Sequence, residues 1–452
     1  MASAYLERSI EAGSNGKTFT YSVWFKLSNL AGNHTIIGLS SDNNNTKYVE
    51  ACVKSNHRMD IQLRNGTSGD NGTYLRRRTN RLFRDTNAWY HFVLRVDSTQ
   101  ASASDRLRVY FNGVEETSWE DSTGTMPQDY VTDLNNSGAD HRLGRGGGTS
   151  SFYMDGILSH FHLADGQSYG PDTFGETDST TGEWKIKANP GISASDYGTN
   201  GFFILKDDNT GTDHSGNSHN FSTAGTITKT EDSPSNIFAT WNYLWAQSNG
   251  NVGDVTFSNG NTTTTTSSHY RTTPASLGMF GSGKYYWEIK RIEDDGNDLH
   301  AGVMSEDATP ANTATWIGNA ANGWVLAGDG GNPYNGGTGG SAISNASFPN
   351  SGDIHMCAYD ASTGKLYFGA NGTWGGTADP STGANPHYTL DTSKVYFPCV
   401  STGSDCSANF GNGYFGTTAV GSAGTNASNI GIFEYDVPTG FTALSTKGIN
   451  SF

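Results

Sequence analysis

The sequence predicts an all-β protein with two antiparallel, jelly-roll-like β-sandwich domains joined by an ordered, turn-rich connector. Three observations favour this fold class. Apolar residues alternate with polar ones in many short segments, which is typical of strands with one buried face. The 452 residues include 58 glycines, and 12% are aromatic, a composition that suits short strands and tight turns. No long segment shows the 3.6-residue periodicity of an amphipathic helix.

Residues 1–172 form the first predicted sandwich. In residues 19–27 one strand face carries Tyr21, Val23, Phe25 and Leu27, and the other carries Ser22, Trp24 and Lys26. We expect a neighbouring segment to cover Trp24. Three further strands direct these side chains inward: Phe92, Leu94 and Val96; Leu107, Val109 and Phe111; Ile157, Phe161 and Leu163. In the last strand Leu158, His160 and His162 are expected on the opposite face. Strands at this density predict two sheets packed face to face.

Residues 173–245 form the predicted connector. They are rich in turn-forming residues and poor in apolar ones. Apolar anchors nevertheless recur, which indicates an ordered strap rather than a free linker. The anchors are Phe221, Ile227, Ile237, Phe238 and Trp241. The apolar run GFFILK, residues 201–206, is expected to form a single strand within this segment.

Residues 246–452 form the second predicted sandwich. In the strand KYYWEIKRI one face carries Tyr285, Trp287 and Ile289, and the other carries Tyr286, Glu288 and Lys290. Further strands are expected at HMCAYD, KLYFGA and VYFPCVS. The segment GIFEYDV, residues 431–437, is predicted to be a closing edge strand.

Two Asn-Gly pairs mark hairpin turns. Asn112-Gly113 and Asn371-Gly372 each predict a type I′ turn, because both central residues of that turn need positive φ. Gly364 can likewise adopt positive φ, at the turn that precedes Asn371-Gly372. A phosphate-binding loop would need a helix after its glycines, and here strands follow. The glycines are therefore interpreted as turn residues.

Charge and composition exclude several classes of protein. The net charge of −16 argues against a nucleic-acid partner and against an anionic membrane surface. No apolar segment approaches the roughly 20 residues that span a bilayer, and we expect no signal peptide at the N-terminus. The four cysteines lack the spacing of a disulfide framework, so we predict buried thiols in a chain made in a reducing cytosol. We expect no cofactor.

Several motifs carry family resemblances. FTYSVWFKL, WYHFVLRVD, LRVYFNGVEE, HRLGR and FYMDGILSHFHLADG together resemble a laminin-G/concanavalin A-like lectin domain. GSGKYYWEIK, HAGVM, GWVLAGDGGNPYNGG, GDIHMCAYDASTGKLYFGANGTW, VYFPCVS and ANFG resemble a SPRY domain. The connector and the ending FEYDVPTGFTALSTKGIN are similar to those of marine bacteriophage chains that fuse these two modules. The resemblance implies a virion structural protein that binds through loops.

The sequence gives little support for a catalytic site or a metal site. A retaining glycosidase needs two carboxyl groups roughly 5–5.5 Å apart, and no apolar strand carries such a pair, so no catalytic residue is predicted. The acidic residues after the first Asn-Gly turn are interpreted as solvated loop charges: Glu115, Glu116, Glu120 and Asp121. A cation at the acidic loop of Glu293, Asp294, Asp295 and Asp298 stays open, with a plain loop favoured. His160 and His162 lack a third ligand, so no metal site is predicted.

Three aromatic residues are the ligand-binding candidates. Trp316, Trp324 and Tyr334 fall between the predicted strands of the second sandwich. Aromatic rings offer flat apolar faces for sugars or proteins and few rotamers to immobilise. For Trp324, packing in the core is favoured over ligand binding. For Trp316 and Tyr334, core packing and ligand binding are equally supported.

One basic segment is the candidate for docking a partner. It supplies Arg76, Arg77, Arg78, Arg81 and Arg84, the one concentrated positive stretch in an acidic chain. Such a stretch suits an acidic neighbour in an assembly or an anionic sugar. A solvated surface segment is the competing interpretation.

The sequence as a whole predicts a non-enzymatic structural component of a phage particle, in a tail or capsid fibre or appendage. It would bind a host-surface glycan or protein through loop surfaces. A capsid decoration or cement protein that binds only other virion proteins is the first alternative, and a polysaccharide hydrolase is the weaker one. We expect other virion proteins as partners, a homo-oligomer with a trimer as first hypothesis, and location in the virion after synthesis in the host bacterial cytoplasm.

Overall fold

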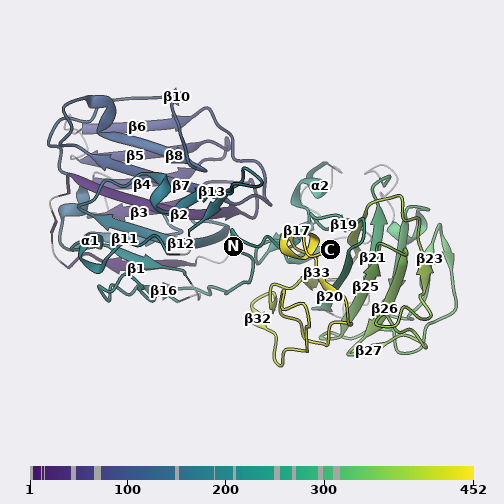
Figure 1. The fold of residues 1–452 in the computed structure, drawn as a ribbon. Coiled ribbons are helices and arrows are strands. Elements are labelled where there is room, and N and C mark those ends of the chain that lie inside the picture. Colours follow the sequence, from purple (N-terminus) through teal and green to yellow (C-terminus); the bar gives the residue numbers. More distant parts are fainter. Residues whose placement is uncertain are drawn as a thin grey trace. The chain divides into compact units, whose positions relative to one another are not determined.

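The computed structural model describes residues 4–11, 13–14, 16–41, 47–65, 73–147, 152–187, 189–206, 210–248, 255–266, 271–293, 299–308 and 316–452. The chain divides into two compact units, Met1–Lys229 (unit 1) and Thr230–Phe452 (unit 2). Both units consist mainly of antiparallel strands, so the predicted all-β fold of two sandwiches is confirmed (Figure 1). The longest described helix, α2 (Tyr243–Ser248), has 6 residues, and no described helix could cross a lipid bilayer.

Unit 1 contains two main antiparallel sheets. Figure 1 shows the eight-stranded sheet from β10 at its upper edge to β16 at its lower edge. In spatial order its strands are β10 (Trp119–Asp121), β6 (Thr73–Thr79), β5 (Met59–Asn65), β4 (Lys47–Val53), β3 (His34–Ser40), β11 (Asp140–Leu143), β1 (Tyr5–Ser9) and β16 (Ser222–Ala224). The six-stranded sheet has the order β15 (Phe202–Ile204), β12 (Gly156–Asp165), β2 (Thr18–Leu27), β7 (Tyr90–Asp97), β8 (Leu107–Phe111) and β9 (Val114–Glu115).

The hydrophobic core of unit 1 lies between these two sheets. It receives side chains such as Phe92 from the six-stranded sheet and Ile61 from the eight-stranded sheet. The inward faces predicted for residues 19–27, 92–96 and 107–111 are confirmed, because their alternate side chains all contact this core. Period-two alternation therefore identified the buried faces of these strands.

Strand β12 departs from the predicted alternation. Its pairing with β2 changes register after Ser159, and His160 adopts a φ of 47°. Such a bulge inserts an extra residue and inverts the side-chain alternation on one side of it. Leu158 therefore packs against the core, and Ile157 does not share the inward face of Phe161. The prediction that placed Ile157 inward and Leu158 outward is wrong for this reason.

Part of the predicted connector covers the outer face of the six-stranded sheet. The short strands β13 (Gly175–Thr177) and β14 (Trp184–Ile186) form a hairpin, and helix α1 (Ala194–Tyr197) follows. Phe174 packs with Val93 and Tyr110 of that face. Trp184 reaches His91, which stacks on Trp24 with 4.8 Å between ring centroids. A neighbouring segment thus covers Trp24, as predicted.

The remaining connector residues belong to both units. The predicted strand within residues 201–206 exists as β15, which pairs with β12 and extends the six-stranded sheet. Phe221 and Ile227 pack against the core of unit 1, whereas Phe238 and Trp241 lie in apolar clusters of unit 2. The described part of the connector is ordered through these anchors.

Unit 2 also contains two main sheets. The larger has the order β17 (Val255–Ser258), β18 (Thr263–Thr266), β30 (Cys406–Asn409), β20 (Lys284–Arg291), β25 (Ile354–Asp360), β26 (Lys365–Ala370) and β27 (Thr373–Trp374), with β28 (Tyr388–Thr389) beside β26 and β33 (Thr442–Ala443) beside β20. The smaller has the order β19 (Arg271–Pro274), β29 (Tyr396–Thr402), β21 (Leu299–Ser305), β22 (Gly323–Ala327), β23 (Pro333–Asn335) and β24 (Thr338–Gly339). β31 (Tyr414–Phe415) and β32 (Thr418–Ala419) form a separate hairpin, and helix α3 (Thr446–Ile449) lies near the end of the chain.

The C-terminal segment covers the outer face of the larger sheet of unit 2. Trp287 and its same-face neighbours point into the core between the sheets, as predicted. Tyr286 and Glu288, predicted on the opposite face, are also fully buried, because Phe433 and Phe441 pack over them. Residues 431–437 form no strand and instead lie across the sheet, so the prediction of an edge strand is wrong.

The predicted turns and thiols are confirmed. Asn112 and Gly113 have φ of 48° and 80°, and Asn371 and Gly372 have φ of 48° and 83°. The four cysteines are free and buried.

Candidate binding surfaces

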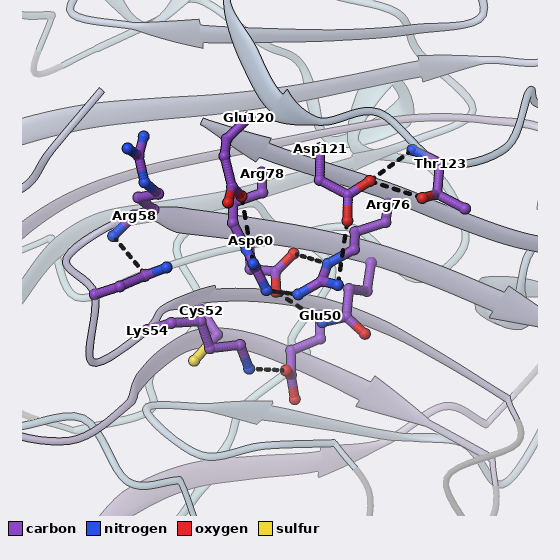
Figure 2. Close-up of polar contacts among 12 residues, drawn as sticks. Glu50, Cys52, Lys54, Arg58, Asp60, Arg76, Arg78, Glu120, Asp121 and Thr123 are labelled. Carbon is purple, nitrogen blue, oxygen red and sulfur yellow. Dashed lines mark hydrogen bonds and ion pairs between the residues drawn. The ribbon is translucent and has the colours of Figure 1, made fainter. Parts of the chain in front are cut away.

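A charged network lies on the outer face of β5 and β6. Alternation directs Asp60 away from the core, opposite Arg78 in the register of the two strands. The fully buried Asp60 carboxylate accepts hydrogen bonds from Nε and Nη2 of Arg76 at 2.9 and 2.7 Å and from Nη2 of Arg78 at 3.1 Å. Figure 2 shows the two guanidinium groups converging on this carboxylate. The arginines therefore neutralise a carboxylate that water does not reach.

Each arginine also contacts an acidic residue of the edge strand β10. Nη1 of Arg76 lies 3.2 Å from Oδ2 of Asp121, and Nη1 of Arg78 lies 3.3 Å from Oε2 of Glu120. Burial raises the pKa of Asp60 even though the hydrogen bonds and the positive charge of Arg76 oppose the shift. Hydrogen bonds from Thr123 lower the pKa of Asp121. The network thus joins three strands through carboxylates in unlike environments (Figure 2).

The other three arginines of the basic segment have separate positions. Arg77 donates to the carbonyl oxygens of Thr123 and Gly124, each at 3.1 Å. Nε of Arg81 lies 2.9 Å from Oε2 of Glu116, and Arg84 is exposed. The docking role of the five arginines stays a prediction, but four of them already bind groups of this chain.

The acidic residues after the first hairpin were predicted to be solvated loop charges, and this is wrong, because all four form ion pairs. Glu115, in β9, lies 3.2 Å from Arg108. Glu116 is 8% exposed and pairs with Arg81, while Glu120 and Asp121 pair with the arginines of β6. The partners of these last three residues lie about 35 to 45 positions away in the sequence, so spacing could not reveal them. The predicted acidic loop at Glu293 is described only at that residue, and Asp294, Asp295 and Asp298 lie outside the described residues.

Polar contacts continue across the same face of the eight-stranded sheet. Nζ of Lys54 lies 3.2 Å from Oε1 of Glu50 and 4.9 Å from the centre of the Phe152 ring. Further along the sheet, Nε and Nη2 of Arg142 lie 2.5 and 2.7 Å from carboxylate oxygens of Glu7 and Asp140. Ion pairs therefore fix charged side chains from β6 to β1, which reduces the rotamer freedom that a ligand would have to immobilise.

Two of the three aromatic candidates come together in unit 2. Trp316 and Tyr334 pack edge to face with 4.8 Å between ring centroids, and His300 lies 4.5 Å from the Trp316 ring. All three rings belong to the outer face of the smaller sheet, and the rings of Trp316 and Tyr334 are half-buried. Gly318 permits this arrangement, because a Cβ there would lie 2.1 Å from the Trp316 ring.

The third candidate, Trp324, lies on the other face of that sheet. Its ring packs against the core and meets Tyr396 edge to face at 5.6 Å. Neighbouring residues of a strand point to opposite faces, and Val325 correspondingly joins the cluster of Trp316. The structure thus separates Trp324 from Trp316 and Tyr334.

His162, one of the two histidines considered as metal ligands, is a packing group. His162 is buried, stacks on Phe203 at 3.9 Å, and shares a 2.9 Å hydrogen bond with the hydroxyl of Tyr197. Burial lowers its pKa, which keeps the imidazole neutral. Over the described ranges of the chain, no three His, Cys, Asp or Glu side chains converge as metal ligands would.

Comparisons with known proteins concern the fold. Residues 3–168 match the family model described as the concanavalin A-like lectin/glucanases superfamily. Among solved structures, the chain is similar to the SPRY domain of human HERC1, with 22% sequence identity, 34% of this chain and 91% of that chain covered, and a TM-score of 0.27. For a heptameric SAP-like pentraxin of Limulus polyphemus the values are 18%, 35%, 69% and 0.25. For the CBM40 of the Ruminococcus gnavus IT-sialidase bound to alpha2,3 sialyllactose they are 11%, 37%, 94% and 0.27. No curated protein matches.

Unit 1, in which residues 3–168 match this superfamily, has two unlike outer faces. An apolar layer that includes Phe174 covers the six-stranded sheet. The eight-stranded sheet instead carries guanidinium, carboxylate and ammonium groups in fixed positions, including Arg76, Glu50 and Lys54. Such groups can form charge-assisted hydrogen bonds, often two at a time, with sugar hydroxyls or with polar groups of a protein. Sequence reasoning found the arginines of this face but missed Asp60, Glu50 and Lys54.

Proposed function

We propose that this chain is a structural component of a bacteriophage particle, in a tail or capsid fibre or appendage, and that it binds host-surface glycans. The observation that carries the proposal is the fixed polar face of unit 1, where ion pairs hold Arg76, Arg78 and Lys54 in place. The match of residues 3–168 to a superfamily that includes lectins supports glycan binding. The likeness of the fused modules to phage chains supports a place in the particle.

The proposed mechanism is multivalent adhesion. Charged groups with fixed geometry bind sugar hydroxyls at a small entropic cost, although each contact remains exposed to water and is weak. Phe152, whose ring lies against Lys54, adds an apolar surface for a sugar ring. Many copies on one particle then raise the avidity well above the affinity of a single site. We expect a closed homo-oligomer, with a trimer as the first hypothesis.

The test compares two lysine variants of the full chain. Lys54→Ala removes an ammonium group from the polar face, whereas Lys17→Ala removes one from the separate Lys17–Asp129 pair at 3.0 Å. Binding is measured on an array of bacterial surface glycans, and thermal unfolding shows that both variants fold. We expect Lys54→Ala to bind glycans more weakly than the unaltered chain, and Lys17→Ala to bind them equally well. Absence of binding to every glycan by the unaltered chain contradicts glycan recognition.

Deletion of the gene tests the place in the particle. Intact particles that fail to adsorb to the host support attachment. Fragile particles indicate a decoration or cement protein, and new reducing ends after incubation with host polysaccharide indicate a hydrolase. Particles that form, survive and adsorb normally contradict a structural role in the virion altogether.

A further inference from the structure

A pocket opens where strands β1 and β16 separate. The two strands pair from Tyr5 to Glu7, with Ser222 opposite Glu7. Beyond this pair the two segments enclose a solvent-open cavity of about 340 Å³. This volume lies at the lower end of the roughly 300–1,000 Å³ of small-molecule sites. The residues around it include Glu7, Arg8, Glu11, Ser218, Asn220 and Ser222.

Arg8 lies in this pocket as a buried cation. The residue is 8% exposed, and it shares a strand face with Leu6, which belongs to the core of unit 1. Its Nη1 atom is buried without a hydrogen-bond partner, and the guanidinium forms no ion pair with a described residue. A buried charge without a partner is strongly unfavourable, so such a group is normally paired.

Two nearby carboxylates of unit 1, those of Asp213 and Glu7, are occupied by other donors. Asp213 accepts hydrogen bonds from the backbone amides of Phe203 and His219, both at 2.8 Å, and from the amide and hydroxyl of Ser215 at 2.9 and 2.7 Å. Glu7 is held by Arg142 at 2.5 Å. Arg8 therefore forms no ion pair with a described residue, and the charges of Glu11 and Asp213 favour its guanidinium without contacting it directly.

Other groups of the pocket can donate hydrogen bonds. Oδ1 of Asn220 accepts from the backbone amide of Asp213 at 2.9 Å, which leaves Nδ2 as the donor of that amide. Ser218, whose hydroxyl can donate a hydrogen bond, also lines the pocket. A guanidinium with neighbouring amide and hydroxyl donors is the chemistry that recognises oxyanions.

We propose that this pocket binds an oxyanion, namely a carboxylate, sulfate or phosphate group carried by a small polar ligand such as an acidic sugar. The anion accepts hydrogen bonds from Arg8, Asn220 and Ser218 and supplies the counter-charge that Arg8 lacks. Glu11 also lines the pocket and opposes the bound anion through its negative charge. The site is distinct from the face around Asp60, and its test does not involve the particle.

The experiment titrates the full chain by calorimetry with glucuronate, glucose 6-sulfate, glucose 6-phosphate and neutral glucose. The unaltered chain is expected to bind at least one of the three anionic sugars and not glucose. Arg8→Met is expected to weaken that binding at least tenfold, because the positive charge that pairs with the anion is lost. Glu11→Gln is expected to tighten it about two- to fivefold at low salt. Lys185→Gln removes an ammonium group elsewhere in unit 1, which pairs with Asp178 at 3.2 Å, and should leave the affinity unchanged.

Thermal unfolding separates a binding role from a structural one. Without ligand, Arg8→Met should melt at the same temperature as the unaltered chain or higher, because an unpaired buried charge becomes an apolar side chain. A lower melting temperature for Arg8→Met would show that the arginine holds the fold. That result, equal binding by Arg8→Met, or no binding of any anionic sugar at millimolar concentration would each overturn the proposal, and none of them bears on attachment to a host.

Discussion

The backbone amide of Tyr435 donates a 2.8 Å hydrogen bond to Oε1 of Glu288, which lies 147 residues earlier in the chain. The carboxylate also accepts from the amide of Glu434 at 3.0 Å and from side chains of Tyr286 and Asn409 at 2.9 and 3.2 Å. One buried acid of β20 thus anchors the C-terminal segment to the sheet. Burial raises the pKa of Glu288 to about 7, although the hydrogen bonds favour its charged form.

Glu288 should make the stability of unit 2 depend on pH. Its pKa in the folded state, about 7, exceeds the ordinary value of 4.5, so the folded chain holds this proton more tightly than the unfolded chain. The resulting stabilisation is fully present below pH 4.5 and is lost as the pH rises through 7, by up to about 3 kcal/mol. Urea unfolding of Glu288→Gln and of the unaltered chain, followed from pH 4.5 to 8, should differ in slope. Glu306→Gln, an exposed control in the same unit, should keep the original slope.

Asp60→Asn should destabilise unit 1 strongly. The substitution leaves the guanidinium groups of Arg76 and Arg78, which are 23% and 21% exposed, without their shared carboxylate. Breaking a buried ion pair from one side costs about 3 kcal/mol. Denaturant unfolding of Asp105→Asn, which removes an exposed partner of Arg108, should show a far smaller change. Equal effects of the two substitutions would show that the Asp60 network contributes little.

Trp184→Ala should uncover His91. The Trp184 indole donates to Nδ1 of His91 at 3.0 Å, so Nε2 carries the ring proton toward Ser22. Burial lowers the pKa of His91 to about 3, so its contribution to stability is present above pH 6.5 and is lost as the pH falls toward 3. Without the indole, the pKa should rise toward 6.5, as measured by NMR titration of the imidazole, and unfolding should become easier by about 3 kcal/mol. An unchanged His91 titration would refute the covering role.

Gly175→Ala should displace the same indole without removing it. A Cβ at this position would lie 2.5 Å from the Trp184 ring, closer than van der Waals contact allows. We expect a red-shifted tryptophan fluorescence and a loss of stability of about 1–3 kcal/mol. Gly182→Ala serves as a partial control, because no heavy atom lies within 4 Å of its Cβ position although its φ is 75°. A spectrum like that of the unaltered chain would contradict the close packing.

Trp316 and Trp324 should respond differently to alanine substitution. Trp324 packs on the core, so Trp324→Ala should cost about 3 kcal/mol in unfolding free energy. Trp316 lies in the half-buried cluster with Tyr334, so Trp316→Ala should change ligand binding by unit 2 more than its stability. Glycan-array binding together with thermal unfolding distinguishes the two. A larger stability loss for Trp316→Ala would reverse the assignment.

Alternation of side chains predicted most of the fold because it reports a local property, the side of a sheet on which a residue lies. It succeeded for residues 19–27, where each side chain follows the pleat. It failed for Ile157 and Leu158 in β12, because the residue inserted after Ser159 reverses the alternation between the two ends of the strand, and no residue type marks such an insertion. It could not show that residues 431–437 cover a sheet, since an apolar run suits a strand and a covering segment equally.

The candidate sites were predicted only in part, because charge partners depend on strand order. The arginines of β6 stand out as a run, but Asp60 lies on the neighbouring strand and looks like any acidic residue in an alternating segment. The pocket around Arg8 is equally absent from the sequence pattern, since it is also lined by Ser218 and Asn220, which follow more than 200 residues later. Only the three-dimensional arrangement shows which charges are compensated.

The four native thiols are shielded from labelling reagents. All are buried, and burial raises the pKa of Cys52 to about 11 and that of Cys406 to about 12, so neither forms a reactive thiolate near neutral pH. A single cysteine introduced at the exposed position of Ser104 would then be the accessible nucleophile of the described chain. Maleimide-linked gold attached there offers a way to locate this protein in electron micrographs.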